Sequence, residues 1–289
     1  MDRKPKPPWL KRRLITKSST KDVSRLIDDL GLHTVCQEAR CPNQAECFSK
    51  STATFMILGD RCSRDCTFCA VAHGVQRPPN PDEPRWVAEA VYRLGLGYVV
   101  ITSVTRDDLA DGGAAHFAAT IEAIHLLKPD TLVEVLVPDF QGSRSSIALV
   151  LDAQPSVLNH NVETVPRLYA AVRPQAHYDR SLRLLAKVKQ QNPEIVTKSG
   201  FMVGLGETAA EVTVLLRDLK KVGCDLVTIG QYLRPSKAHH PVLEYIHPDL
   251  FRAYAREAET LGFLGVASDP YVRSSYRAEE LYRQARGMG

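Results

Sequence analysis

The chain has 289 residues, of which 44% are hydrophobic and 24% are charged, a composition typical of a globular protein and unlike that of a disordered or fibrous one. No run approaches the roughly 20 apolar residues of a membrane span, and the N-terminus has no apolar signal core, so we expect a cytoplasmic protein without membrane association. Seven cysteines, six of them in two tight triplets, argue against a secreted disulfide framework and for a reducing compartment.

The first 50 residues are expected to form an N-terminal extension, with a short helix near Lys21–Leu30 that ends at Gly31. Residues 1–20 carry a charge of +6, which leaves the rest of the chain at −2. Such an arm contacts nucleic acid, an acidic protein or only solvent, and its three prolines disfavour the amphipathic helix of a transit peptide. The basic residues of the arm are Arg3, Lys4, Lys6, Lys11, Arg12, Arg13 and Lys17.

A first cysteine triplet follows this arm. Cys36, Cys41 and Cys47 are spaced as Cx4Cx5C. Thiolates at such short spacing are typical ligands of zinc or of iron–sulfur clusters. The triplet either holds a centre of its own or pools its thiols with the second triplet, and its compactness favours a separate site.

The second triplet, Cys62, Cys66 and Cys69, forms a CxxxCxxC loop directly after an apolar run. The residues between these cysteines are mainly charged or polar, which disfavours buried structural thiols. Zinc would need a fourth ligand nearby, whereas three cysteines on a four-iron cluster leave one iron open for a ligand that is not protein. The seventh cysteine, Cys224, lies in an apolar stretch and is expected to be buried and structural.

From residue 52 onward, strands and helices alternate. Strands are expected at Thr54–Leu58, Tyr98–Val104, Leu132–Val137, Val157–Asn161, Ile195–Val203 and Leu226–Leu233. Helices are expected at Pro84–Leu94, Ala114–Leu127, Ser145–Leu151, Pro166–Val172, Arg180–Gln191 and Ala209–Val222. Six strand–helix units with short apolar strands predict an α/β fold, a partial (β/α)6 barrel with N-terminal and C-terminal extensions.

We therefore expect three segments: an N-terminal extension at 1–50, the partial barrel at 51–238 and a C-terminal extension at 239–289. The last segment is expected to hold a helix at Pro248–Leu261, a strand-like stretch at Phe263–Ala267 and a final helix. In such folds the chemistry collects at the carboxyl ends of the strands, where the CxxxCxxC loop lies.

A CxxxCxxC loop after the first strand, with Phe68 just before its third cysteine, resembles the signature of the radical S-adenosylmethionine superfamily. The resemblance implies that Cys62, Cys66 and Cys69 ligate a 4Fe-4S cluster. It also implies that S-adenosylmethionine chelates the open iron and, after reduction, yields a radical that abstracts unactivated hydrogens.

The Cx4Cx5C triplet, residues 106–114, residues 160–165 and the segment Arg273-Ser274-Ser275-Tyr276 together resemble the lipoyl synthase family. That resemblance implies a second, auxiliary 4Fe-4S cluster held by Cys36, Cys41, Cys47 and Ser275. It also implies insertion of sulfur from this cluster at C6 and C8 of a protein-bound octanoyl-lysine. Without the resemblance, residues 273–276 are expected to form a turn whose hydroxyls satisfy backbone groups.

The same resemblance implies an octanoylated lipoyl-carrier protein as partner, either a lipoyl domain of a 2-oxoacid dehydrogenase E2 subunit or a glycine-cleavage H protein. The resemblance also implies an electron donor such as flavodoxin or ferredoxin. It implies no nucleic-acid partner. Carriers of this kind are generally acidic, which gives the basic arm a target.

Contacts to S-adenosylmethionine are expected from residues at strand ends. Asn161 and Glu163 are assigned to the ribose and Arg173 to the methionine carboxylate, the alternative being polar residues that face water. The superfamily's Gly-Gly-Glu motif for the methionine amine has no clear counterpart, since Gly112 and Gly113 come late and are followed by Ala114. Adenine contacts are assigned to Met202, Gly204, Gln231 and Tyr232.

None of the nine histidines is assigned a ligand role, and His239 and His240 are expected to form an exposed pair. Two other functions were weighed. One is a sulfur-inserting radical enzyme related to biotin synthase, whose extra thiols would lie on barrel strands. The other is a zinc-binding module of a basic nucleic-acid-binding protein, which six strand–helix units argue against.

Overall fold

The computed structural model describes residues 5–11, 18–39, 41–49 and 53–288. Five residues of the basic arm therefore lie outside the described residues, namely Arg3, Lys4, Arg12, Arg13 and Lys17. None of the helices in the described part is long and apolar enough to span a membrane.

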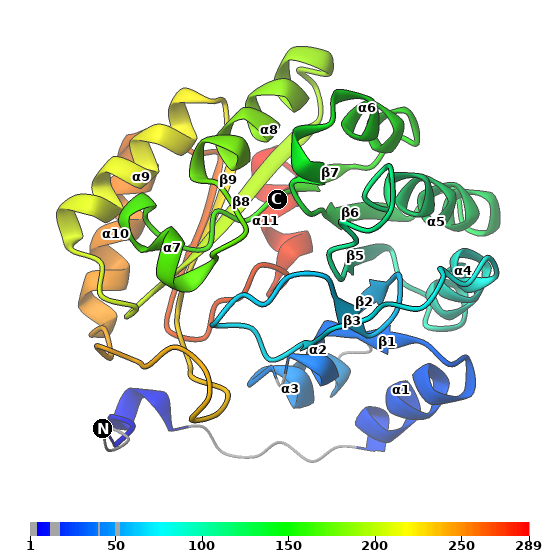
Figure 1. Ribbon diagram of the computed structural model, residues 1–289, viewed down its shortest axis with the longest axis horizontal. Helices are drawn as coiled ribbons and strands as arrows, with labels where there is room; N and C mark the ends of the chain where they lie inside the picture. Colours follow the sequence, from blue (N-terminus) through cyan, green and yellow to red (C-terminus); the bar gives the residue numbers. More distant parts are fainter. Residues whose placement is uncertain (1–4, 12–17, 40, 50–52, 289) are drawn as a thin grey trace.

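The core of the fold is one curved sheet with the strand order β1-β2-β5-β6-β7-β8-β9-β10, in which β1 and β10 are the two ends (Figure 1). From β2 to β10 neighbouring strands are parallel, and β1 (His33–Thr34) pairs antiparallel with β2 (Thr54–Ile57). The other strands are β5 (Tyr98–Ser103), β6 (Leu132–Leu136), β7 (Val157–Asn159), β8 (Val196–Val203), β9 (Leu226–Gln231) and β10 (Gly265–Ser268).

Helices cover the outer face of this sheet, as right-handed crossovers between parallel strands require (Figure 1). They are α4 (Glu83–Arg93), α5 (Ala114–Leu127), α6 (Arg144–Asp152), α8 (Tyr178–Gln191), α9 (Ala209–Lys221) and α10 (Pro248–Thr260). The short helix α7 (Tyr169–Val172) instead lies over the opening of the barrel in Figure 1. The six predicted strand–helix units and the open, partial barrel are confirmed. The strand-like stretch of the C-terminal segment is β10, which continues the parallel sheet beyond the sixth unit.

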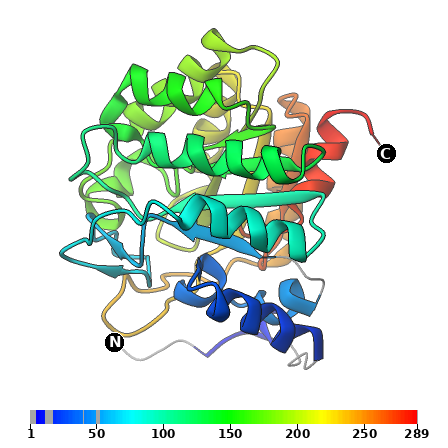
Figure 2. The ribbon, with the colours of Figure 1, turned by 90° about the vertical axis from the view of Figure 1, so that its right-hand side faces the viewer.

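The N-terminal segment lies beneath the first strands of the barrel (Figures 1 and 2). It contains α1 (Ser18–Asp29), the edge strand β1, and two short helices that we did not predict, α2 (Val35–Glu38) and α3 (Gln44–Ser49). Thr34 caps α2 by accepting a hydrogen bond from the backbone N–H of Gln37. Cys36 therefore lies on α2 and Cys47 on α3.

The last helix, α11 (Ala278–Ala285), closes the amino-terminal end of the barrel. Its Ala278, Leu281 and Tyr282 pack against interior side chains of the strands, including Tyr98 and Val157. Figure 2 shows this helix at the opposite end of the molecule from the loop of the second cysteine triplet. The chain between β10 and α11 therefore enters the barrel interior, and this segment contains residues 273–276 of the predicted site.

Candidate active site

A cavity of about 500 Å³ opens at the carboxyl ends of the strands. Its wall includes residues at or just after the ends of five strands: Ser103, Val137, Asn161, Met202 and Gly230. All six cysteines of the two triplets line this one cavity, together with Ser275: Cys36, Cys41, Cys47, Cys62, Cys66 and Cys69. The structure thus brings both triplets and the terminal Ser-Ser segment to the position that the parallel fold predicts for chemistry.

The loop of the second triplet is fixed on several sides. It begins at β3 (Arg61–Cys62), which pairs with β4 (Ala72–His73). The Cys62 sulfur accepts hydrogen bonds from the backbone N–H groups of Arg64 at 3.4 Å and Thr105 at 3.3 Å. The Thr67 N–H donates to the carbonyl of Val172 at 3.0 Å, which ties the loop to α7.

His239 and His240 hold the other side of this loop. A ring nitrogen of His239 lies 2.9 Å from the Cys69 carbonyl, and the backbone N–H of His240 donates to the Thr67 carbonyl at 2.8 Å. Both residues are half-buried, so the expectation of an exposed pair is wrong. The sequence shows only two adjacent polar residues, whereas the fold places them against a loop some 170 residues earlier.

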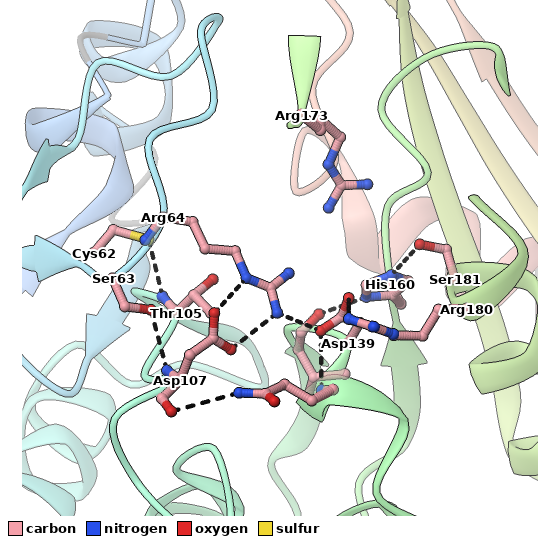
Figure 3. Close-up of polar contacts among 12 residues, drawn as sticks. Cys62, Ser63, Arg64, Thr105, Asp107, Asp139, His160, Arg173, Arg180 and Ser181 are labelled. Carbon is pink, nitrogen blue, oxygen red and sulfur yellow. Dashed lines mark hydrogen bonds and ion pairs between the residues drawn. The ribbon is translucent and has the colours of Figure 1, made fainter. Parts of the chain in front are cut away.

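Arg64, between the first two cysteines of the loop, reaches under the cavity to two carboxylates (Figure 3). It forms a two-point ion pair with Asp107 at 2.6 and 2.9 Å and donates to Asp139 at 2.7 Å. Only 5% of the Arg64 side chain and none of the Asp139 side chain is exposed. Burial alone would raise the pKa of the Asp139 carboxyl, but the hydrogen bond and charge of Arg64 hold it well below its ordinary value.

His160 lies beside this ion pair, buried at the end of β7 (Figure 3). Burial, and then the positive charge of Arg173, lower the pKa of His160 to about 4, so its imidazole is neutral at physiological pH. Its Nδ1 lies 2.8 Å from the Val137 carbonyl, which only accepts, so Nδ1 is the donor. Its Nε2 then accepts from the Ser181 hydroxyl at 2.9 Å. His160 has both ring nitrogens occupied and is a structural support.

The first triplet is joined to the C-terminal segment by two hydrogen bonds. The side-chain amide of Asn43 donates to the Tyr271 carbonyl at 2.7 Å, and the Tyr276 hydroxyl donates to Glu46 at 3.0 Å. These contacts connect positions 228 and 230 residues apart. Ser275 lies between the two tyrosines, in a turn at residues 274–277, and lines the same cavity as the first triplet. The expected turn is present, but the Ser274 hydroxyl bonds to the side chains of Asn159 and Asn161 instead of to backbone groups.

Asn161 and Glu163 lie together on the cavity wall after β7, and the Asn161 amide donates to Glu163 at 3.0 Å. Glu163 has φ +65°, a left-handed conformation that costs free energy for a residue with a side chain. Its backbone is held there by β8, because its N–H donates to Gly200 at 3.0 Å and its carbonyl accepts from Met202 at 2.8 Å. Burial raises the pKa of the Glu163 carboxyl.

Arg173 lies on the same wall and has an unused donor. Its Nη1 donates to the carbonyls of Asn161 at 3.0 Å and Val162 at 3.2 Å. Its Nε is buried and has no hydrogen-bond partner among the described residues. A buried guanidinium donor without an acceptor indicates an anionic ligand that the protein alone does not supply.

The residues assigned to adenine divide into two groups. Met202 and Tyr232 line the cavity. Gln231 is fully buried outside it, and its amide is saturated by the carbonyls of Val203, Tyr232 and Glu244 and by the N–H of Ile246. Gly204 approaches Gln231 so closely that a Cβ would lie 2.2 Å from its Nε2. The free space at Gly204 is therefore used by Gln231.

The charge of the buried cysteine sulfurs depends on whether a cluster is bound. Burial raises the pKa of Cys36 and of Cys69 to about 12 and raises that of Cys66, so without a bound cation these sulfurs stay protonated. An iron–sulfur cluster supplies the positive charge that favours thiolate. Among the described residues, no three His, Cys, Asp or Glu side chains are arranged around a single ion. Thiolates on different irons of one cluster do not need that arrangement.

Several supporting residues were not recognised as site residues from the sequence: Arg64, Asp107, Asp139, His160, Asn43 and Tyr276. Arg64 and Asp107 carried a signal, since both lie in polar loops directly after strands. Tyr276 belongs to the Arg273–Tyr276 segment, but its partner Glu46 could not be predicted, and Asn43 carried no signal, because these partners are more than 200 residues away. Gly113 also has a structural role, since its Cβ would lie 2.3 Å from the Leu58 side chain where α5 begins.

The Radical SAM superfamily profile matches residues 56–219 of the chain, more than half of its length. The "Crystal structure of HydG: A maturase of the [FeFe]-hydrogenase" superimposes with a TM-score of 0.59 and 14% identity, over 93% of this chain and 67% of that one. SuiB of Streptococcus suis bound to S-adenosylmethionine superimposes with a TM-score of 0.58 and 13% identity, over 78% and 53% of the two chains. These structures support the fold.

Proteins found by sequence comparison are much more similar to this chain than these solved structures are. Lipoyl synthase of Caldicellulosiruptor saccharolyticus is 58% identical over 275 residues, which cover 95% of this chain and 96% of that protein. Lipoyl synthase of Methylococcus capsulatus is 55% identical over 277 residues, covering 95% and 86% of the two chains. The chain therefore belongs to the lipoyl synthase family of the radical SAM superfamily.

Proposed function

We propose that this protein inserts two sulfur atoms, at C6 and C8, into an octanoyl chain that is amide-linked to a lysine of a carrier protein. The observation that carries the proposal is the meeting of two cysteine triplets and Ser275 on one cavity, in a chain of the lipoyl synthase family. Such a site places a hydrogen-abstracting centre and a sulfur source on the two sides of a substrate.

Two 4Fe-4S clusters are proposed. Cys62, Cys66 and Cys69 would hold the cluster whose fourth iron is open to S-adenosylmethionine. The first triplet and Ser275 would hold the auxiliary cluster. The anchoring of residues 271–276 to α3 and its preceding loop supports this assignment, because it keeps Ser275 near Cys41 and Cys47. A serine alkoxide is a harder ligand than thiolate, so the iron it holds is the one most readily released.

When bound, the clusters and S-adenosylmethionine supply hydrogen-atom abstraction at unactivated carbon and the sulfur that replaces each hydrogen. The protein binds and orients these groups. Glu163, with one carboxylate oxygen already accepting from Asn161, keeps the other for a ribose hydroxyl. Arg173 offers its unpaired Nε to the methionine carboxylate. Met202 and Tyr232 would flank the adenine, and Gly204 and Gln231 would shape the loop behind it.

A lipoyl-carrier protein, either a lipoyl domain of an E2 subunit or a glycine-cleavage H protein, is the proposed partner. The basic side chain of Lys6 lines the same cavity and is exposed, which places part of the basic arm at the cavity mouth. An acidic carrier would be attracted to this side of the cavity as its octanoyl-lysine enters. A small electron donor such as flavodoxin or ferredoxin would reduce the cluster of the second triplet.

The decisive experiment is anaerobic incubation of the reconstituted protein with S-adenosylmethionine, dithionite and an octanoyl-lysyl peptide, followed by mass spectrometry. We expect a peptide that has gained two sulfur atoms and about two 5′-deoxyadenosine molecules for each product, since one S-adenosylmethionine is cleaved to 5′-deoxyadenosine for each replaced hydrogen. Formation of 5′-deoxyadenosine without sulfur in the peptide would reject the sulfur-insertion function and retain only superfamily chemistry.

A further inference from the structure

A column of buried hydrogen bonds runs through the barrel interior from its closed end to the cavity. At its base lies Glu134 of β6, fully buried, which accepts from Lys198 at 2.9 and 3.1 Å and from the Tyr98 hydroxyl at 2.6 Å. The Asn159 amide also donates to this carboxylate, at 2.9 Å. Lys198 and Asn159 are themselves fully buried. None of these four residues was assigned a role from the sequence.

Ser274 connects this base to the cavity wall. Its hydroxyl accepts from the Asn159 amide at 3.0 Å and donates to the Asn161 side-chain carbonyl at 2.8 Å. Asn161 in turn donates to Glu163 at 3.0 Å. Ser274 is therefore the one member of the column that belongs to the terminal Ser-Ser segment, and its neighbour Ser275 lines the cavity.

The direction of the lower bonds in the column follows from Glu134. A carboxylate that receives three donors accepts only, so Asn159 must turn its NH2 group toward it, and the Asn159 carbonyl oxygen is left without a partner in the described structure. The Asn159 NH2 group also donates to the Ser274 hydroxyl. That hydroxyl donates in turn to the Asn161 side-chain carbonyl.

The same constraint continues to the cavity. Because the Asn161 carbonyl oxygen is used by Ser274, the Asn161 NH2 group has to face Glu163. Gly200 leaves room for this side chain, since a Cβ there would lie 2.9 Å from the Asn161 carbonyl oxygen. The column thus connects the buried carboxylate at its base to the polar atoms that the wall presents to a ligand.

We propose that Ser274 is a positioning residue that couples the two halves of the site. It orients Asn161 and Glu163 for the ribose of S-adenosylmethionine, and it anchors the segment that carries Ser275. This inference rests on the proposed S-adenosylmethionine contacts of Asn161 and Glu163.

Binding of S-adenosylmethionine to the reconstituted, unreduced protein tests the inference without turnover. Loss of one hydrogen bond is worth about 1 kcal/mol, so Ser274→Ala should weaken binding about fivefold to tenfold. Ser274→Thr, which keeps the hydroxyl, should restore affinity to within about twofold by the same reasoning. The matched control is Ser268→Ala, since the Ser268 hydroxyl donates to the Phe251 carbonyl outside the column. Unchanged affinity in Ser274→Ala would overturn the proposal.

Two further measurements separate positioning from general destabilisation. In a double-mutant cycle, Ser274→Ala and Glu163→Gln should be non-additive, because the first acts through the second. Ser274→Ala should also retain the iron content, which loss of a cluster ligand would lower. Strict additivity in the cycle would contradict the claim that Ser274 acts through Glu163.

Asn161→Asp tests the bond direction and remains informative if Ser274→Ala fails to fold. It replaces the NH2 group with a carboxylate oxygen facing Glu163, so it should bind S-adenosylmethionine more weakly than Asn161→Ala; wild-type affinity would reject the assigned direction. Unchanged affinity in both Asn161→Ala and Glu163→Gln would instead reject the proposed ribose contacts. If Asn161→Ala and Glu163→Gln bind S-adenosylmethionine more weakly while Ser274→Ala binds it normally, the ribose contacts stand and only the positioning role of Ser274 is rejected.

Discussion

Arg64 and Asp139 form a buried ion pair, 2.7 Å apart, between the loop of the second cysteine triplet and the end of β6. With Asp107 as the second acceptor, the pair fixes the loop to two neighbouring strands from below the cavity. The position of three thiols therefore depends on a guanidinium that touches none of them through its side chain.

Removing Arg64 should destabilise the fold strongly. In Arg64→Gln the buried carboxylate of Asp139 loses its main partner, and breaking such a pair typically costs about 3–5 kcal/mol. Urea unfolding of the cluster-free protein measures this loss. Arg61→Gln, in the same loop but exposed, is the matched control and should change the free energy of unfolding by less than about 0.5 kcal/mol. Equal effects of the two substitutions would contradict the assignment.

The same ion pair predicts a pH dependence. The folded-state pKa of Asp139 is depressed, so its contribution to stability is complete above the ordinary aspartate pKa, near 4, and is lost as pH falls below that value. The free energy of unfolding of the cluster-free protein should therefore fall more steeply between about pH 4 and 3 than that of Asp139→Asn. Parallel curves for the two proteins would show that Asp139 has an ordinary pKa in the folded state.

The two triplets should load independently. Reconstituted wild-type protein should hold about eight irons per chain, and Cys36→Ala or Cys62→Ala about four each, if each triplet holds one four-iron cluster as proposed. Cys224→Ala is the control, since Cys224 is buried against backbone carbonyls away from the cavity, and it should keep about eight. Loss of nearly all iron in both single-triplet variants would favour one centre shared by six thiols. A colourless protein that contains zinc would reject both interpretations, two separate iron–sulfur clusters and one iron centre shared by six thiols.

Ser275→Ala should separate the two halves of the chemistry. The second triplet is unaffected, so cleavage of S-adenosylmethionine should continue, while sulfur transfer to an octanoyl-lysyl peptide should fall by at least about tenfold, the effect of losing one ligand or supporting contact at a metal site. Quantifying 5′-deoxyadenosine and thiolated peptide in the same reaction gives the ratio. A normal auxiliary cluster with full sulfur transfer would show that Ser275 is not a ligand.

Charge reversal in the basic arm should act on the carrier protein only. Lys6→Glu with Lys11→Glu should slow turnover of an octanoylated carrier at low salt, and the difference from wild type should vanish near about 0.5 M salt, where charges are screened within a few ångströms. A short octanoyl-lysyl peptide is the control substrate and should react at the wild-type rate. An equal loss with both substrates would place the defect in the site itself.

The sequence predicted the barrel well because its strands are short, apolar and regularly separated by helices. The bounds of α5 agree at both ends, where Gly113 begins the helix and Pro129 follows it. Helices α2 and α3 were missed because four and six residues are too few to display a helical period.

The site was less accessible to prediction where contacts are distant along the chain. Gln231 was assigned to the cavity as a polar residue at a strand end, yet the structure uses its amide to hold residues 203–246 together. The link from Asn43 to Tyr271 could not be read from either segment alone. Spacing identifies the thiols, whereas only the folded chain shows that both triplets and Ser275 line one cavity.

The two hydrogen bonds that join the first triplet's segment to the C-terminal segment can form only late in the synthesis of the chain. Cys36, Cys41 and Cys47 leave the ribosome first, and the whole barrel must follow before Tyr271 and Tyr276 can bind Asn43 and Glu46. A nascent chain therefore exposes three thiols without the segment that carries Ser275. If the first triplet and Ser275 hold a cluster as proposed, iron delivered during translation would meet an incomplete ligand set, and that set would be complete only after the barrel has been synthesised.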